Sequence, residues 1–60
     1  MLEQYEDIMS VEDLCEVFKV GRGRIYELLQ TKQIQGFRLG KNWKIPKIAV
    51  VDYIKKQAGK

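Results

Sequence analysis

The stretch FRLGKNWKIP, residues 37–46, decides the fold of this chain. Apolar and polar residues alternate in it on both sides of a Gly-Lys-Asn tripeptide, a period of two that is typical of β-strands. The tripeptide contains glycine and asparagine, which favour tight turns. Residues 35–45 are therefore predicted to form a β-hairpin, and Pro46 opens the next element.

The length of the turn sets the register of this hairpin. We expect a three-residue loop at residues 40–42, because it places all four apolar residues on one face. The expected cross-strand pairs are Leu39 with Trp43, Arg38 with Lys44 and Phe37 with Ile45. Asn42 suits the left-handed conformation that often ends such a loop. Trp43 is interpreted as hairpin core rather than as a stacking platform for a base.

The signals for a helix start converge on Ser10. With Ser10 as N-cap, Asp13 falls at the N3 position of a capping box. Met9 and Leu14 then occupy the two positions of a hydrophobic staple. The spacing of a buried stripe is met by Val11, Leu14, Cys15 and Phe18. We predict a short helix whose outer face is acidic.

A second helix is predicted from about Arg22 to Thr31, with an apolar stripe of Ile25, Leu28 and Leu29. Gly21 can serve both as the tight turn before this helix and as its N-cap. The alternative is a loop that ends at Gly23. Two short helices joined by about three residues, with glycine in the turn, make a helix-turn-helix pattern.

A third helix is predicted from Pro46, in its first turn, to about Gln57. Val50, Tyr53, Ile54 and Gln57 lie on one of its faces. Ile48 and Val51 lie beside that face and form a second apolar stripe, which we interpret as a candidate protein interface. The alternative is that residues 1–8 fold back over them.

The charge of the chain changes sign along its length. Residues 1–18 contain six of the eight carboxylates and no Lys or Arg, whereas residues 19–60 contain all eleven basic residues. The net charge of +3 therefore conceals a strongly basic second part. Concentrated positive charge attracts a phosphate backbone, so nucleic acid is the first partner to test. The three cations of the hairpin are consistent with nucleic-acid binding. The alternative is that these exposed charges only keep the protein soluble.

Several function classes lack the residues they need. The chain has no histidine, one cysteine and one serine, so Ser-His and Cys-His pairs, an internal disulfide and a His/Cys zinc set are excluded. We expect no enzyme activity, no metal, no cofactor and no small-molecule ligand. Cys15 is interpreted as a small core residue. No apolar run approaches the roughly 18 residues of a membrane span, so we expect a cytoplasmic protein that does not bind membranes.

Three runs carry a resemblance to a known family: MSVEDL at 9–14, VGRGRIYELL at 20–29 and FRLGKNWKIP at 37–46. They resemble the excisionase-type winged-helix DNA-binding domain, which is similar to the DNA-binding heads of mercury-resistance-type regulators. The resemblance covers about residues 8–55. It implies an α+β fold in which a helix-turn-helix is followed by a two-stranded hairpin wing and a C-terminal helix. We expect one domain over residues 1–60, with 1–8 and 58–60 peripheral.

The resemblance also implies a site. The second helix would enter the major groove, and the wing would grip phosphate or the minor groove. An arginine at the start of that helix can read guanine or clamp a phosphate. The candidate DNA-binding residues are Arg22, Gly23, Arg24, Tyr26, Glu27, Gln30, Lys32, Arg38, Lys41, Asn42 and Lys44. The family usually has serine or threonine where Gly21 stands, often threonine at Arg24, and polar residues at Ile48 and Val51.

Family members bind and bend attachment-site DNA and so assist a recombinase in excising a mobile element. This role implies double-stranded DNA, an integrase or recombinase, and neighbouring copies on DNA as partners, with the bound form associated with a bacterial nucleoid. A small transcriptional regulator is the alternative with the same chemistry. A protein-interaction adaptor that works through Ile48 and Val51 is the alternative from another class, and the salt dependence of DNA binding separates it from the others.

Overall fold

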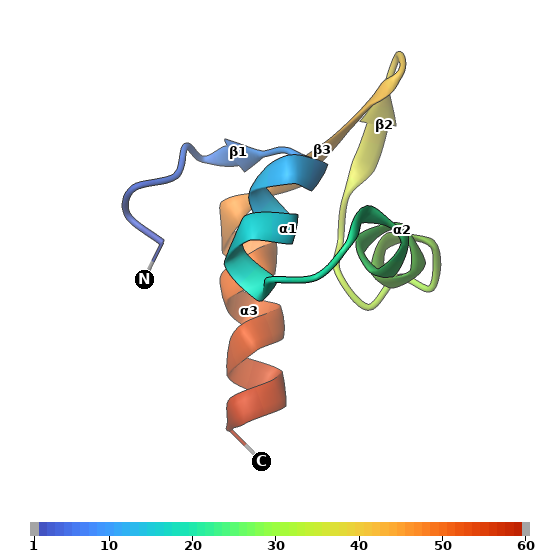
Figure 1. The fold of residues 1–60 in the computed structure, drawn as a ribbon. Helices are drawn as coiled ribbons and strands as arrows, with labels where there is room; N and C mark the ends of the chain where they lie inside the picture. Colours follow the sequence, from blue (N-terminus) through green and yellow to red (C-terminus); the bar gives the residue numbers. More distant parts are fainter. Residues whose placement is uncertain (1, 60) are drawn as a thin grey trace.

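The computed structural model describes residues 2–59, which form three helices and three strands (Figure 1). The elements follow one another along the chain as β1 (Ile8–Met9), α1 (Val11–Phe18), α2 (Arg22–Gln30), β2 (Phe37–Leu39), β3 (Asn42–Pro46) and α3 (Lys47–Ala58). The strands form an antiparallel sheet in the order β1-β3-β2. The predicted α+β architecture of helix-turn-helix, hairpin and C-terminal helix is confirmed, and a third short strand extends the predicted two-stranded hairpin.

Helix α1 begins at the predicted capping box. The Ser10 hydroxyl accepts a hydrogen bond from the Asp13 N–H at 3.2 Å, and the Ser10 N–H donates to Asp13 Oδ2 at 3.1 Å. Met9 and Leu14 are both buried, as the predicted staple requires. Because the first N–H groups of a helix have no partners within it, these side chains give α1 a defined start from local sequence alone.

The turn between α1 and α2 uses Lys19, not Gly21, as its left-handed residue. Lys19 has φ 58° and ψ 46°, and the Val20 N–H donates to the Cys15 carbonyl at 3.2 Å. Gly21 is the N-cap of α2, with φ −78° and ψ 169°. That conformation is extended backbone open to any residue, so the prediction of Gly21 as the tight-turn residue is wrong, while its prediction as N-cap is confirmed. Gly23 lies inside α2, which excludes a loop ending there.

The register of the hairpin differs from the prediction by one residue. Phe37 lies opposite Lys44, Arg38 opposite Trp43 and Leu39 opposite Asn42. The turn therefore has two residues, and its first, Gly40, has φ 68°. A type II′ turn requires a positive φ at this position, which glycine adopts without strain.

The predicted three-residue loop is wrong because only one face of the hairpin meets the core. Ile45 is fully buried and Trp43 is partly buried, whereas Phe37 and Leu39 are 50% and 63% exposed. The four apolar residues therefore lie on two faces of the hairpin, with Trp43 and Ile45 on one and Phe37 and Leu39 on the other. Arg38 and Lys44 do not oppose each other, and Asn42 pairs in β3 instead of adopting a left-handed conformation.

Strand β1 ties the amino-terminal segment to the hairpin. Ile8 pairs with Pro46 and Met9 pairs with Ile45, and the Lys47 N–H donates to the Asp7 carbonyl at 2.7 Å. Pro46 ends β3 and is the N-cap of α3, one position before the first-turn place predicted for it. The prediction that residues 1–8 and 58–60 are peripheral includes residues 1 and 60, which lie outside the described part of the chain.

Tyr5 adds a second attachment of this segment. Its hydroxyl donates a 2.7 Å hydrogen bond to a Glu16 carboxylate oxygen on α1. This bond, more than any other cause, raises the pKa of Tyr5 above its ordinary value. The favourable contribution is complete below the ordinary tyrosine pKa and is lost as the pH rises through the raised value. The attachment is therefore intact at neutral pH.

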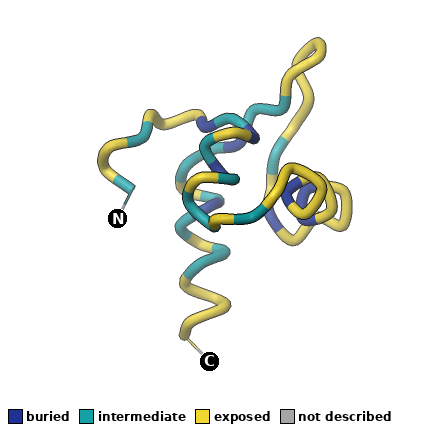
Figure 2. Tube along the Cα trace, in the orientation of Figure 1, coloured by how far each residue is buried: buried dark blue, intermediate teal, exposed yellow. Residues whose placement is uncertain are grey.

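The core is small and entirely apolar. Nine residues of the described chain are buried: Met9, Val11, Leu14, Ile25, Leu28, Leu29, Ile34, Ile45 and Val50. They lie where α1, α2, β3 and the first half of α3 meet, and Figure 2 shows that the wing tip and the end of α3 are exposed. Cys15, Phe18, Tyr53 and Ile54 pack against this core partly buried. With so few core residues, helix caps contribute a large share of the stability.

We predict that Ser10→Ala destabilises the protein by about 1 kcal/mol, because it removes the oxygen that accepts from the Asp13 N–H. In a domain of this size the melting temperature should fall by about 4–8 °C, measured by circular dichroism. Ser10→Thr is the matched control, since it keeps the accepting hydroxyl. An unchanged melting temperature for Ser10→Ala would show that the capping box does not stabilise the fold.

Candidate nucleic-acid interface

Helix α2 presents one buried and one exposed face. Ile25, Leu28 and Leu29 point into the core. The six predicted contact residues on this helix are all exposed: Arg22, Gly23, Arg24, Tyr26, Glu27 and Gln30. The 3.6-residue period thus separates the residues that hold the helix in place from those that can meet a ligand.

Arg22, the first residue of α2, is paired with α1. Its Nη2 atom lies 2.7 Å from Glu12 Oε2, and both side chains are more than half exposed. An exposed pair of this kind contributes at most about 1 kcal/mol to stability. The pair matters more for geometry, because it holds the Arg22 guanidinium beside the acidic helix that precedes it.

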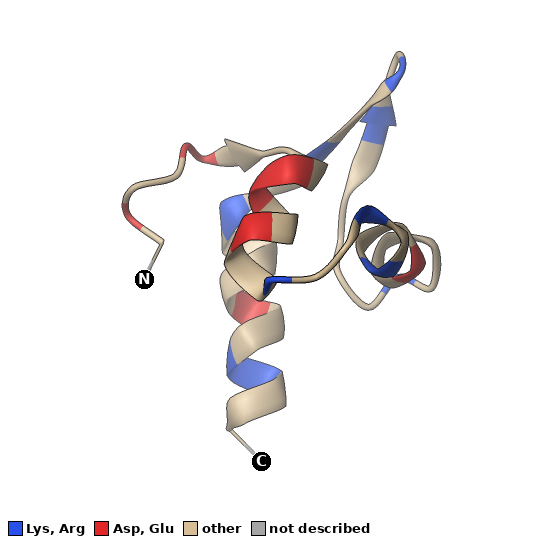
Figure 3. Ribbon diagram, in the orientation of Figure 1, with Lys and Arg blue, Asp and Glu red and all other residues tan. Residues whose placement is uncertain are grey.

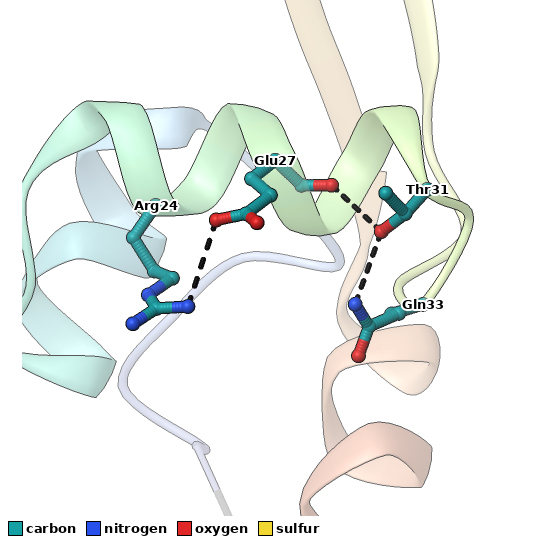
Figure 4. A network of polar contacts seen from close by, with 4 residues as sticks. All are labelled: Arg24, Glu27, Thr31 and Gln33. Carbon is teal, nitrogen blue, oxygen red and sulfur yellow. Dashed lines mark hydrogen bonds and ion pairs between the residues drawn. The ribbon is translucent and has the colours of Figure 1, made fainter.

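Arg24 belongs to a polar network on another side of α2 (Figure 4). Its Nη1 atom lies 3.5 Å from Glu27 Oε1, one helical turn further on. The Glu27 carbonyl accepts from the Thr31 hydroxyl at 2.7 Å, and Thr31 Oγ1 accepts from Gln33 Nε2 at 3.1 Å. The Glu27 carbonyl also accepts from the Thr31 N–H at 3.0 Å, so the Thr31 hydroxyl adds a second hydrogen bond to it at the end of α2. Arg24 is therefore positioned along the helix rather than straight out from it.

Two lysines follow helices in the left-handed conformation. Lys19 ends α1 and Lys32 follows α2, with φ values of 58° and 62°. Glycine is the usual residue at such positions, and a side chain there carries a conformational penalty. Both lysines are exposed. Lys19 was not among the predicted contact residues, although a basic residue in the turn of a helix-turn-helix pattern is the signal by which it could have been included.

A groove of about 410 Å³ brings α2 and the wing together. Four predicted contact residues line it: Tyr26, Lys41, Asn42 and Lys44. The opposite wall is the start of α1, with Ser10, Glu12 and Asp13. Arg24 and Glu27 do not line this groove; they line one of about 340 Å³ that also includes Phe18 and Tyr53. On α2, Tyr26 thus lines one groove, and Arg24 and Glu27 line the other.

The charges are separated in space as well as in sequence. Figure 3 shows most acidic residues along the amino-terminal segment and α1, and basic residues on α2 and along the hairpin to its tip, while α3 carries both signs and α2 also carries one carboxylate. Between Glu27 and Asp52 the chain has no carboxylate side chain. In the part of the chain that the structure describes, Arg38, Lys41 and Lys44 form no ion pair. The hairpin therefore carries positive charge with no internal counter-charge.

The second apolar stripe of α3 is open to solvent. Ile48 is 79% exposed and Val51 is partly buried, and both line a groove of about 280 Å³ with Asp7 and Lys47. Lys47 Nζ donates to the Tyr5 carbonyl at 3.1 Å and lies 3.8 Å from Asp7 Oδ1. The amino-terminal segment thus reaches α3 at Lys47. It leaves Ile48 uncovered, contrary to the alternative in which it folds over both apolar residues.

Neither a cluster of metal ligands nor a membrane-spanning helix occurs in the described chain. Within residues 2–59, His, Cys, Asp and Glu side chains form no group of three or more that could hold a metal ion. None of the described helices has the length and apolar character needed to cross a membrane.

The helix pair, the hairpin wing and the third helix define a small winged helix-turn-helix protein. A family model described as "Helix-turn-helix domain" matches residues 8–58, and the chain belongs to this family. It is also similar to a protein of Streptomyces ambofaciens named "Excisionase", with 28% identity over 53 residues that cover 88% of this chain and 86% of the relative. The predicted excisionase-type resemblance is confirmed. No solved structure matches the chain.

Proposed function

We propose that this protein binds double-stranded DNA sequence-specifically, with α2 in the major groove and the wing on the adjacent phosphates or minor groove. The observation that supports this most directly is the hairpin, whose Arg38, Lys41 and Lys44 lack any acidic partner in the described chain. Clustered cations of this kind bind phosphates with release of counterions. Membership of the helix-turn-helix family supports DNA as the partner of α2, because the second helix of this motif enters the major groove.

Gly23 supports the placement of α2. A Cβ atom built on Gly23 would meet nothing within 4 Å, so packing inside the protein does not require glycine there. Glycine inside a helix costs about 1 kcal/mol relative to alanine. A bare backbone on the exposed face of α2 is useful when another molecule must approach it closely. We assign that molecule as DNA, with Arg22, Tyr26 and Gln30 around the point of approach.

The biological role that fits best is that of an excisionase-like recombination directionality factor. The relative from Streptomyces ambofaciens is named for excision and matches this chain over most of both lengths. In this role the protein binds and bends attachment-site DNA of a mobile element, which helps an integrase to excise it. Helix α2 and the wing are the two DNA-reading elements that such a role needs.

We assign the integrase contact to the groove formed by Asp7, Lys47, Ile48 and Val51. Ile48 is the most exposed large apolar residue of the described chain, and it lies on α3, outside the α2 and wing surfaces assigned to DNA. An apolar side chain rimmed by an acidic and a basic residue is typical of a protein contact rather than a DNA contact. A neighbouring copy on DNA is the other occupant that fits this groove.

DNA binding should depend strongly on salt. If about four to six phosphates are neutralised, log K should fall with log salt concentration at a slope of roughly −4 to −5. Lys41→Ala should weaken binding to specific and random duplexes about equally and reduce the slope by roughly 1. Fluorescence anisotropy between low and physiological salt measures both. Binding that does not change with salt would contradict the proposed function.

Gly23→Ala should separate stability from binding. The free energy of unfolding should rise by up to about 1 kcal/mol, because alanine is the better helix former and the added methyl meets no protein atom. DNA affinity should fall, because the methyl group would occupy the space that DNA approaches. Denaturant unfolding and anisotropy titrations measure the two effects. Full DNA affinity in the stabilised variant would place the DNA away from this face of α2.

Ile48→Lys should prevent recruitment of the integrase of the same mobile element, while the melting temperature and the affinity for a single DNA site stay unchanged. Gln57→Lys is the matched control, because it makes the same change of charge at an exposed position of α3. Pull-down of the purified integrase on site DNA measures recruitment. Loss of cooperative binding between copies, with recruitment intact, would instead assign the groove to a neighbouring copy, and a large fall in melting temperature would assign Ile48 to the core.

A further inference from the structure

The outer face of the wing carries two apolar side chains that the core does not use. Phe37 and Leu39 are two residues apart on β2, so they project from the same face of the hairpin. They are 50% and 63% exposed, and neither belongs to the core. Their opposite neighbours in the ladder are Lys44 and Asn42, which share that face. The wing therefore presents apolar surface bordered by a cation and an amide.

The charges around this face indicate which kind of partner it can bind. The chain has no carboxylate between Glu27 and Asp52, and Lys41 adds a cation at the tip beside Leu39. An exposed apolar patch rimmed by polar groups marks an interaction site. Here the rim is positive, so the complementary partner is an anionic surface with apolar material within reach. The minor groove of duplex DNA has phosphates at its edges, and the apolar faces of its bases become accessible where a base step is unstacked.

The shape of the tip also fits. A two-residue turn is the shortest common hairpin connection, and the minor groove of ordinary duplex DNA is only about 6 Å wide. Figure 1 shows the hairpin projecting beyond the helices. Leu39 is the last residue of β2 before the turn, and Gly40 has no side chain that would shield it. Leu39 is therefore the apolar group that reaches furthest.

We propose that Leu39 is an apolar wedge that the wing inserts between base pairs from the minor groove, with Phe37 covering the adjacent sugars, and that this insertion kinks the DNA. The inference rests on the proposed function and supplies a physical mechanism for the bend. Leucine and phenylalanine side chains serve as such wedges in other architectural proteins. Lys41 and Lys44 stay on the phosphates at either side.

The wedge also generates sequence preference without a hydrogen bond to any base. Unstacking a base step carries an energetic cost, which is smallest at flexible pyrimidine–purine steps such as TA and CA. Sites with such a step opposite the wing tip should therefore bind best. Specificity at that position would come from the deformability of the DNA rather than from direct readout by α2.

The test uses a short duplex that the full chain enriches from a randomised pool. One set of duplexes carries a donor and an acceptor dye at its ends to report bending, and another carries 2-aminopurine at successive steps to report unstacking. Leu39→Ser should abolish most of the bend and the 2-aminopurine signal and weaken binding about tenfold, as expected from one leucine that is no longer buried. The salt slope should stay unchanged, because no charge is altered. Leu39→Met, which keeps an apolar side chain, should behave like the original protein.

Each other outcome has a definite meaning. Binding by the original protein with the expected salt slope but without a 2-aminopurine signal would overturn the wedge and leave the proposed function intact. Salt-independent binding would overturn the proposed function itself. Leu39→Ser with a full bend, or Leu39→Met with the same loss as Leu39→Ser, would also overturn the wedge. A lower melting temperature of Leu39→Ser in the absence of DNA would show that Leu39 packs within the protein, and would end the proposal.

Discussion

The pairing of Met9 with Ile45 is the interaction on which the remaining structure depends. Both residues are buried, and they join β1 to the central strand β3. Met9 directly precedes the N-cap Ser10, so the segment that enters the sheet also sets where α1 begins. Because α2 follows α1 after a tight turn, the strand pairing fixes the positions of the helix pair and the wing relative to each other. In a short chain without an internal disulfide, this buried pairing joins the amino-terminal segment to the core.

A small apolar core has a consequence for the surface. Nine buried residues position the three helices and β3. The wing tip and the outer face of α2 contribute no residue to this core. On these surfaces the residue types do not match the preferences of their positions. A glycine lies inside a helix, and a phenylalanine and a leucine are at least half exposed to solvent. Natural sequences usually depart from local preference at functional sites. Gly23 on α2 and Phe37 and Leu39 on β2 are the departures on which the proposed DNA contacts rest.

The acidic helix α1 limits what the basic surface can bind. Glu12 holds Arg22 by an ion pair, and Glu27 holds Arg24 within α2. A phosphate that approaches either arginine therefore competes with a carboxylate for the guanidinium group. The wing cations have no such competitor in the described chain. Affinity for any phosphate backbone should therefore come mainly from the wing, while α2, with its arginines partly neutralised, is better suited to discriminate between sequences than to bind all of them.

The sequence by itself determined the elements and their order, because their signals are local. The capping box at Ser10, the apolar stripe of α2 and the alternation in the hairpin each depend on residues a few positions apart, and the charge separation and the candidate contact residues could be read in the same way. Only the tertiary structure decided the hairpin register, the third strand and which groove Tyr26, Arg24 and Glu27 line. The register and the third strand depend on which hairpin face meets the core and on pairing between Met9 and Ile45, residues 36 positions apart, and no local pattern specifies a contact at that separation.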